Sequence, residues 1–288
     1  MIVEGTTSLH TYVERIQGLV PGVDPSRAEL NSEGLANDVV LVEDLVFRFP
    51  KTEQARRALH TEVAILTHLR GRVSVPIPAP SRVEADVVVY PRVEGRTLDR
   101  LTLARSAPHD QQRLAEQIGR FLSELHQAPI DESLPKTGAP TTLEAQLARR
   151  ADAELYVYPH LMKHQREYAE SLFEILQDPT AFEFEPSLIH GDLGPYHLLV
   201  TDSKLTGVID FGTAGVGDPA NDVACLLQNY GERFVARAGK VYPKIRSLLR
   251  RARFLAQALE LEWIVQGLKN RQPFWFTAHI GAARDLDP

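Results

Sequence analysis

The chain has 288 residues, of which 43% are hydrophobic and 24% charged, an ordinary balance for a globular protein with one large domain or two lobes. Its formal net charge of −6 argues against a nucleic-acid-binding protein, whose binding face would be basic. The single cysteine, Cys225, excludes an intrachain disulfide framework, and we expect it to be a small buried apolar residue. The N-terminus has no signal-peptide pattern and no apolar run reaches about 18 residues, so the sequence predicts a cytoplasmic protein without a membrane partner.

The first 90 residues have the pattern of short strands and one helix. β-Branched and aromatic residues predict strands at 39–42, 45–49 and 87–90. Leucine and valine side chains at helical spacing predict a helix over 54–69. Alternating prolines in 75–80 exclude a helix there and predict an extended connection.

After residue 95 the pattern becomes helical. Apolar stripes predict helices over 111–126 and 142–176 and a long one through 249–263, with short strands and turns over 187–211. This order predicts an α+β, protein-kinase-like bilobal fold with a β-rich N-lobe and a mainly helical C-lobe. The expected parts are an N-terminal nucleotide-binding lobe at 1–90, a hinge at 91–95, and a C-terminal catalytic and substrate-binding lobe at 96–288.

The strongest motif is the segment 189–200, with the sequence IHGDLGPYHLLV. Kinase catalytic loops have the spacing H-x-D-x-x-x-x-N, in which the aspartate accepts the proton of the acceptor hydroxyl and the asparagine holds a metal. Asp192 stands at the aspartate position, and His197 stands where asparagine is usual. His190, two residues before Asp192, is expected to support the loop structurally.

A second motif lies directly downstream, at the end of a predicted strand. Asp210, Phe211 and Gly212 form the Asp-Phe-Gly sequence whose aspartate binds Mg²⁺ in kinases. Phe211 is expected to pack beneath the aspartate, and Gly212 to let the backbone turn away. A predicted β-hairpin separates this motif from the catalytic loop, and the two motifs together predict phosphoryl transfer.

Taken together, HGDL and the later IDFGTAGVGDPANDVA resemble the aminoglycoside phosphotransferase superfamily, which also includes macrolide, choline and fructosamine kinases. The resemblance covers about residues 33 to 230. Histidine at position 197 is similar to the pattern of the aminoglycoside 2″-phosphotransferases and macrolide 2′-phosphotransferases. The resemblance implies a small-molecule kinase that uses ATP or GTP with Mg²⁺, the metal being held by Asp210 and His197. Because Mg²⁺ prefers oxygen ligands, the alternative for His197 is that it holds a water bound to the metal.

The resemblance extends to the nucleotide-binding residues of the first 95 positions. Alternation with the neighbouring phenylalanines places Arg48 where the family has a phosphate-binding lysine, although Lys51 is an alternative. Tyr90 precedes the hinge, where a bulky residue favours GTP over ATP. The residues expected to contact the nucleotide, or to position its phosphates, are Gly34, Asn37, Arg48, Glu62, Tyr90, Arg92 and Val93.

The acceptor side is the least informative part of the sequence. Asp218 and Asp222 fit the start of a helix as a cap and a first-turn carboxylate. The alternative is an acidic patch or an aromatic wall for the acceptor. The candidates for such a surface are Asp218, Asp222, Glu260, Glu262, Trp263, Phe274, Trp275 and Phe276.

The sequence thus predicts an O-phosphotransferase that moves a γ-phosphate to a hydroxyl of an aminoglycoside, a macrolide or a related sugar or amino alcohol. Two alternatives remain: a metabolite kinase unrelated to antibiotics, and a nucleotide-binding pseudokinase that acts as a sensor or scaffold. A protein kinase is disfavoured, because no activation segment ending in Ala-Pro-Glu follows Gly212.

Overall fold

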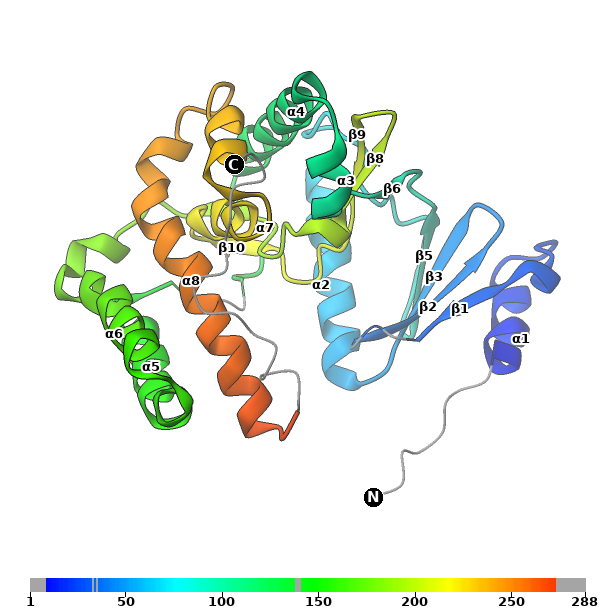
Figure 1. Ribbon diagram of the computed structural model, residues 1–288. Coiled ribbons are helices and arrows are strands. Elements are labelled where there is room, and N and C mark those ends of the chain that lie inside the picture. The colour runs from blue at the N-terminus through cyan, green and yellow to red at the C-terminus, as the bar shows by residue number, and fades with distance from the viewer. Residues whose placement is uncertain (1–8, 33, 35, 138–140, 273–288) are drawn as a thin grey trace.

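The computed structural model describes residues 9–32, 34, 36–137 and 141–272. An antiparallel sheet of five strands, in the order β1-β2-β3-β5-β4, forms the N-terminal part of the molecule (Figure 1). The strands are β1 (Glu29–Asn31), β2 (Asn37–Val42), β3 (Leu45–Pro50), β4 (Arg82–Glu84) and β5 (Val87–Pro91). The predicted strands at 39–42, 45–49 and 87–90 are therefore confirmed.

The two faces of this sheet are covered by different helices. Helix α1 (Leu9–Leu19) packs its apolar side chains against Phe47 and Phe49, whereas α2 (Glu53–Leu69) packs against Val46 on the other face. Successive side chains of a strand point to opposite faces, so Arg48 lies on the same face as Val46. This alternation is what directs the Arg48 guanidinium toward α2 and the centre of the molecule.

The chain leaves β5 through a short segment that leads into the C-terminal part. β6 (Arg96–Thr97) already pairs with β8 (Leu198–Thr201) of that part, so regular structure resumes at Arg96. Gly95, with a φ of +137°, lies so close to Thr206 and Leu199 that a Cβ would meet them at 2.5 and 3.0 Å. Only glycine fits this close approach.

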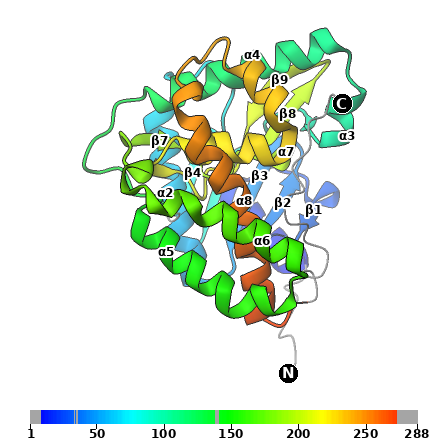
Figure 2. The same ribbon diagram turned by 60° about the vertical axis from the view of Figure 1, so that its left-hand side comes forward.

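Helices dominate the rest of the chain, and α5 and α6 lie against the long helix α8 (Figure 2). The helices are α3 (Arg100–Arg105), α4 (Pro108–His126), α5 (Leu143–Asp152), α6 (Lys163–Leu172), α7 (Ala220–Ala238) and α8 (Ile245–Lys269). Short helical turns occur at Pro25–Arg27, Ala153–Val157, Tyr158–His160, Phe173–Gln177, Pro179–Phe182 and Pro195–His197.

The expectation of one helical stretch over 142–176 was wrong in its continuity. The chain departs from α-helical geometry after Asp152, and a new helix begins only at Lys163. Pro159 lies within this interruption; proline has no N–H to donate, and its ring clashes with the preceding turn. The predicted helices over 111–126 and through 249–263 are confirmed as α4 and α8.

Two small β-elements interrupt the helical part. β8 (Leu198–Thr201) and β9 (Lys204–Val208) form the predicted hairpin, whose turn residues Asp202 and Ser203 both have positive φ. β7 (Ser187–Ile189) pairs with β10 (Gly215–Gly217). The two motif segments, 190–197 and 210–212, are joined by the β8–β9 hairpin. The β7–β10 pair flanks them, because β7 ends just before the first segment and β10 begins just after the second.

Cys225 is buried in α7, as expected. Within the described ranges no helix is long and apolar enough to cross a membrane.

Candidate active site

A cavity of about 580 Å³ lies between the sheet and the helical part. Its lining includes residues from β2, β3, α2, the segment after β5, the catalytic-loop segment and the Asp-Phe-Gly segment. The predicted residues that the structure brings together there are Gly34, Asn37, Arg48, Glu62, Tyr90, Arg92, Val93, Asp192, His197, Asp210 and Gly212.

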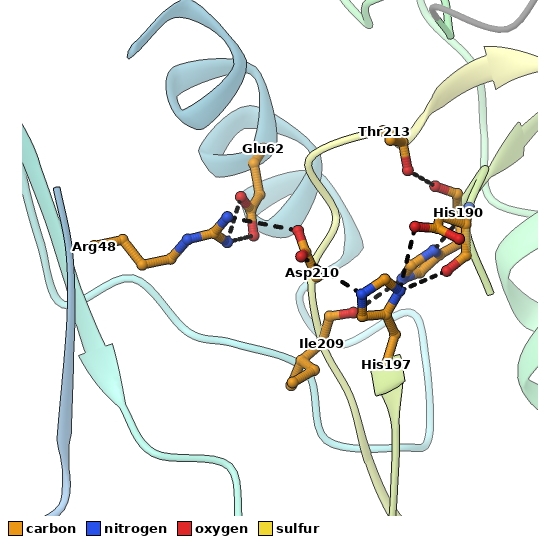
Figure 3. A network of polar contacts seen from close by, with 8 residues as sticks. Arg48, Glu62, His190, His197, Ile209, Asp210 and Thr213 are labelled. Carbon is orange, nitrogen blue, oxygen red and sulfur yellow. Dashed lines mark hydrogen bonds and ion pairs between the residues drawn. The ribbon is translucent and has the colours of Figure 1, made fainter. Parts of the chain in front are cut away.

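Arg48 links the sheet, α2 and the Asp-Phe-Gly segment at the back of the cavity (Figure 3). Its Nη1 lies 2.7 Å from both carboxylate oxygens of Glu62, and its Nη2 lies 3.5 Å from Oδ1 of Asp210. Burial raises the pKa of Glu62 to about 7, although the Arg48 charge opposes this shift. Burial alone would lower the pKa of Arg48, but Glu62, Tyr90 and Asp210 together outweigh it and raise that pKa, so the guanidinium stays protonated.

The cavity also contains buried polar atoms that have no hydrogen-bond partner among the described residues. Two of them are Nε of Arg48 and Oδ1 of Asn37, on residues that are only 8% and 7% exposed. An unpaired buried donor or acceptor costs about 1–3 kcal/mol. Both residues line the cavity, so the cost of these unpaired atoms falls on its wall.

Asp210 and His197 form a pair beside Arg48. Nδ1 of His197 lies 2.7 Å from the backbone oxygen of Asp192 and donates to it, which leaves Nε2 facing Asp210 Oδ2 at 3.6 Å. Burial would raise the pKa of Asp210, but the charge of Arg48 and that of His197 lower it overall. Asp210 has a φ of +65°, a conformation that non-glycine residues seldom adopt and that clusters at functional sites.

The catalytic-loop segment is fixed from beneath by Asp222, the first-turn carboxylate of α7. Its Oδ1 accepts from the Gly191 amide at 2.8 Å, and its Oδ2 accepts from the His190 amide and from Nε2 of His126, both at 3.0 Å. His126 in turn bonds to the hydroxyl of Tyr242 at 3.0 Å. Asp222 is fully buried, and although burial alone would raise its pKa, these bonds lower it below the ordinary value.

His190 is also fully buried and connects the two motif segments. Its Nδ1 accepts the Asp192 amide at 3.3 Å, and its Nε2 donates to the Ile209 carbonyl at 3.1 Å. Burial lowers the pKa of His190, so the ring is neutral, with its proton on Nε2. The Asp192 side chain itself is 57% exposed and open to the cavity.

Phe211 lies beneath this pair of segments, fully buried, with its ring 4.7 Å from that of His190. Gly212 lines the cavity, and a Cβ there would approach Oδ1 of Asp210 at 3.3 Å. The backbone turns at Gly212 and Thr213, where the Ala214 amide donates to the Phe211 carbonyl at 3.0 Å, while the positive φ of this segment belongs to Asp210.

A sequence model described as the phosphotransferase enzyme family, APH, matches residues 27–255. The chain belongs to this family. It is therefore a phosphotransferase, as its sequence predicted. The matched range contains both motif segments and each predicted cavity residue, and it ends within α8.

The relatives of this phosphotransferase include enzymes and solved structures. It is 28% identical over 245 residues to the viomycin phosphotransferase of Streptomyces vinaceus, an alignment that covers 80% of this chain and 82% of the relative. It is 31% identical to a structure of APH(2″)-IIIa with GDP and kanamycin, with a TM-score of 0.82 and coverage of 94% and 95% of the two chains.

Two further structures complete the comparison. A GDP complex of the wild-type aminoglycoside 2′-phosphotransferase-IIIa is 29% identical, with a TM-score of 0.83 and coverage of 94% and 95%. The macrolide 2′-phosphotransferase MphH of Brachybacterium faecium, at 20% identity and a TM-score of 0.71 with coverage of 96% and 98%, shares the fold. The predicted kinase-like bilobal fold is thus confirmed.

The phosphotransferase places the acceptor candidates differently from the nucleotide candidates. Asp218 is fully buried, bonds Arg251 through both oxygens and accepts from the amide of Ala220, the first residue of α7. Asp218 and Asp222 therefore have structural partners and are not acceptor contacts in this arrangement. Glu260 accepts from Gln228 at 2.8 Å, and Trp263 is half exposed on α8.

The remaining acceptor candidates are accounted for as follows. Glu262 accepts from Arg149 at 2.5 Å, so its charge is already compensated. Phe274, Trp275 and Phe276 lie outside the described residues.

Three positions refine the sequence analysis. Lys51 points to loop carbonyls and does not line the cavity, whereas Arg48 does. The Arg92 amide donates to the Asp44 carbonyl at 2.7 Å and is not available to a purine. Sequence reasoning overlooked His126, which bonds Asp222; its position at the end of an apolar helical stripe was the available signal.

Proposed function

We propose that this phosphotransferase moves the γ-phosphate of GTP or ATP to a hydroxyl of a small molecule, with Asp192 as the base. The observation that carries the proposal is the common cavity of Asp192, Arg48 and the Asp210–His197 pair. Phosphoryl transfer needs mainly positioning and charge stabilisation. This reaction requires a carboxylate that orients the hydroxyl, a cation that binds the phosphates, and residues that hold a metal ion.

In this proposal the nucleotide phosphates lie against Arg48. Its Nη1 is engaged by Glu62, and Nη2, which makes one contact with Asp210 at 3.5 Å, has a second N–H for a phosphate oxygen. The purine lies between β2 and the segment after β5, near Tyr90. Since the Arg92 amide is occupied, the Val93 amide is the hinge donor that we assign to the purine.

GTP is our preferred nucleotide over ATP. Two relatives with 29% and 31% identity are GDP complexes. Tyr90 is buried at the cavity wall, where a phenol ring limits depth. A ring at Tyr90 would keep the purine nearer the mouth of the cavity. There the backbone after β5 would contact the edge groups of guanine.

The Asp210 carboxylate beside Arg48 fits Mg²⁺, whereas the His197 imidazole suits a water bound to that ion better than the ion itself. This ion is usually held by one or two carboxylates, with phosphate and water oxygens completing its octahedron. Among the described residues, no group of three or more His, Cys, Asp or Glu side chains could hold a metal ion, so phosphate oxygens would have to supply further ligands. Asp210 directly, and His197 through a water, would hold the ion, which would neutralise charge on the β- and γ-phosphates when bound.

Asp192 would act on the acceptor. Its exposed carboxylate accepts a hydrogen bond from the acceptor hydroxyl and aims the oxygen at the γ-phosphorus. As the new P–O bond forms, the hydroxyl proton passes to Asp192 and the nucleoside diphosphate leaves. The bonds from His190, Asp222 and His197 to the loop hold this geometry.

We infer that the acceptor is a hydroxyl-bearing antibiotic, with aminoglycosides first in the panel to be tested. The viomycin phosphotransferase and the kanamycin complex among the relatives support this class, and they support antibiotic resistance as the biological role. Glu260 and Glu262 already have partners, so an amine of the acceptor would compete with Gln228 and Arg149 for them.

The test is a coupled nucleotide-turnover assay with Mg²⁺ in which GTP and ATP are each paired with kanamycin, gentamicin, viomycin, a macrolide, and simple sugars and amino alcohols. We expect acceptor-dependent release of the diphosphate, fastest with GTP. Nucleotide binding without turnover for any acceptor, together with basal hydrolysis unchanged in Asp192→Asn, would contradict the proposal.

A further inference from the structure

Lys51 is a second cation on the nucleotide side, and it faces the loop between β1 and β2 instead of the cavity. Its Nζ lies 2.7 Å from the Ser32 carbonyl, 2.6 Å from the Gly34 carbonyl and 3.3 Å from Oδ1 of Asp38. An ammonium group has three N–H donors and no acceptor. Two of these contacts are hydrogen bonds to backbone carbonyls, and the third is an ion pair with Asp38, so the charge of Lys51 is directed to the loop and to β2.

Asp38, the carboxylate that faces Lys51, is anchored from the opposite side by α1. It is 8% exposed, and its Oδ2 accepts from the Tyr12 hydroxyl at 2.6 Å. The Tyr12 ring also packs on Phe49, the residue opposite Asp38 in the β2–β3 register, with the ring centroids 4.5 Å apart. The three polar side chains thus form one chain from α1 through Asp38 to Lys51.

The segment that Lys51 holds is part of the cavity wall. Gly34, Ala36 and Asn37 line the cavity, and the Lys51 amide donates to the Ala36 carbonyl at 2.9 Å. Lys51 therefore restrains the loop twice, through its side chain before Ala36 and through its backbone at Ala36. Because a peptide unit is planar, fixing a carbonyl fixes the plane of the whole unit.

We propose that Lys51, together with Asp38 and Tyr12, is a positioning unit that holds the β1–β2 loop in its nucleotide-binding form, so that α1 contributes to nucleotide affinity. This inference rests on the proposed function, because it assigns a role in the same nucleotide site. The proposal gives different roles to Arg48, which lies in β3, and Lys51, which directly follows β3. Arg48 contacts the nucleotide, and Lys51 holds the loop that covers it. Without Lys51, ordering the loop would use part of the free energy of nucleotide binding, and the affinity for the nucleotide would fall.

The experiment measures the affinity for GDP and for ADP, each with Mg²⁺, by isothermal titration calorimetry on the full chain. Lys51→Met keeps most of the length and removes the charge, Lys51→Arg keeps the charge, and Lys163→Met is a matched control on α6, where Lys163 is 91% exposed. We expect Lys51→Met to raise the Kd of the preferred nucleotide about 10-fold, as the loss of one charged hydrogen-bond set implies. Lys51→Arg should stay within about 3-fold of the wild type, and Lys163→Met should be unchanged.

A kinetic measurement separates positioning from general damage. With an acceptor at saturation, Lys51→Met should raise the KM of the nucleotide while kcat changes by less than about 2-fold, because the loop is reordered once nucleotide is bound. Tyr12→Phe keeps the ring contact with Phe49 and removes the bond to Asp38, so we expect a smaller rise in Kd, about 3-fold. That rise should vanish in the Lys51→Met background, since both changes act through Asp38.

Each outcome bears on one of the two proposals. A Kd for Lys51→Met equal to that of the wild type, or a fall in kcat with Kd unchanged, overturns this inference and leaves the proposed function standing. A wild-type protein that binds neither GDP nor ADP overturns both. If Lys51→Met does not fold cooperatively in a thermal melt, Tyr12→Phe alone and in the Lys51→Arg background carries the test, with an unchanged Kd as the contradicting result.

Discussion

The catalytic-loop side and the nucleotide side of the cavity are built in different ways. Beneath the loop, Asp222 accepts three hydrogen bonds, and His190 uses both ring nitrogens within the protein. On the nucleotide side, Arg48 and Asn37 are buried and each keeps a polar atom without a partner among the described residues. The segment that contains Asp192 is therefore held by bonds within the protein, whereas the sheet side of the cavity keeps polar atoms that the described residues leave unpaired. A preorganised loop lowers the barrier of the reaction, and unsatisfied atoms contribute to binding.

The largest effect should come from Asp192→Asn, which separates chemistry from binding. We expect kcat to fall about 10³-fold, in the range known for a lost general base, with the nucleotide Kd within about 2-fold of the wild type. The measurement is steady-state turnover combined with calorimetric titration of GDP. Asp202→Asn, at the tip of the β8–β9 hairpin, is the matched control and should keep full activity. A mutant of Asp192 that loses nucleotide binding instead would place Asp192 on the nucleotide side.

Asp222→Asn should be the next largest change, because it weakens the anchor of the catalytic loop. We expect the free energy of unfolding in urea to fall by about 3 kcal/mol at pH 7, since a buried charged acceptor is lost. The folded-state pKa of Asp222 is lowered, so its stabilisation is present above the unfolded pKa of about 3.9. It is lost as pH falls through the folded-state value, and the difference between mutant and wild type should shrink there. Equal stability of the two proteins at pH 7 would show that the anchor contributes little.

Replacing Arg48 sharpens the comparison from the nucleotide side. Arg48→Lys keeps a charge but loses the planar guanidinium, which contacts Glu62 and Asp210 at the same time and has further N–H donors. We expect the KM of the nucleotide to rise about 10-fold in Arg48→Lys and further in Arg48→Ala. Lys204→Met on the exposed β9 edge is a control for lost charge. An unchanged nucleotide KM in Arg48→Ala would remove Arg48 from the site.

Tyr90 should give the smallest effect, on nucleotide choice. Tyr90→Leu shortens the side chain at the cavity wall and should shift the ratio of kcat/KM for GTP and ATP about 5-fold toward ATP, a value typical of a small change in pocket size. Tyr90→Phe keeps the ring and should leave the ratio unchanged. The ratio is measured by competition between the two nucleotides, and a ratio that is the same in Tyr90→Leu would exclude pocket depth as the determinant.

Much of the nucleotide and catalytic site could be predicted from the sequence, because its residues lie in short motifs with fixed spacing. Asp192, His197 and Asp210 follow from two segments joined by one hairpin, and Arg48 follows from strand alternation. The cavity that they share confirms their proximity, while the roles of these residues remain to be tested. Trp263 and Glu260 do not line that cavity, and their contact with the acceptor stays a prediction, because acceptor surfaces combine helices that are distant in sequence and carry no local signature.

The sequence by itself determined the family, the kinase-like plan and the two motif segments, since hydrophobic periodicity and motif spacing are local properties of the chain. Only the tertiary structure decided how the charges pair. It gave Asp218 and Asp222 to Arg251 and the catalytic loop, Lys51 to the β1–β2 loop, and Arg48 to the cavity. The reason is that a buried charge must find a partner, and which partner lies within reach depends on the packing of segments that the sequence places far apart.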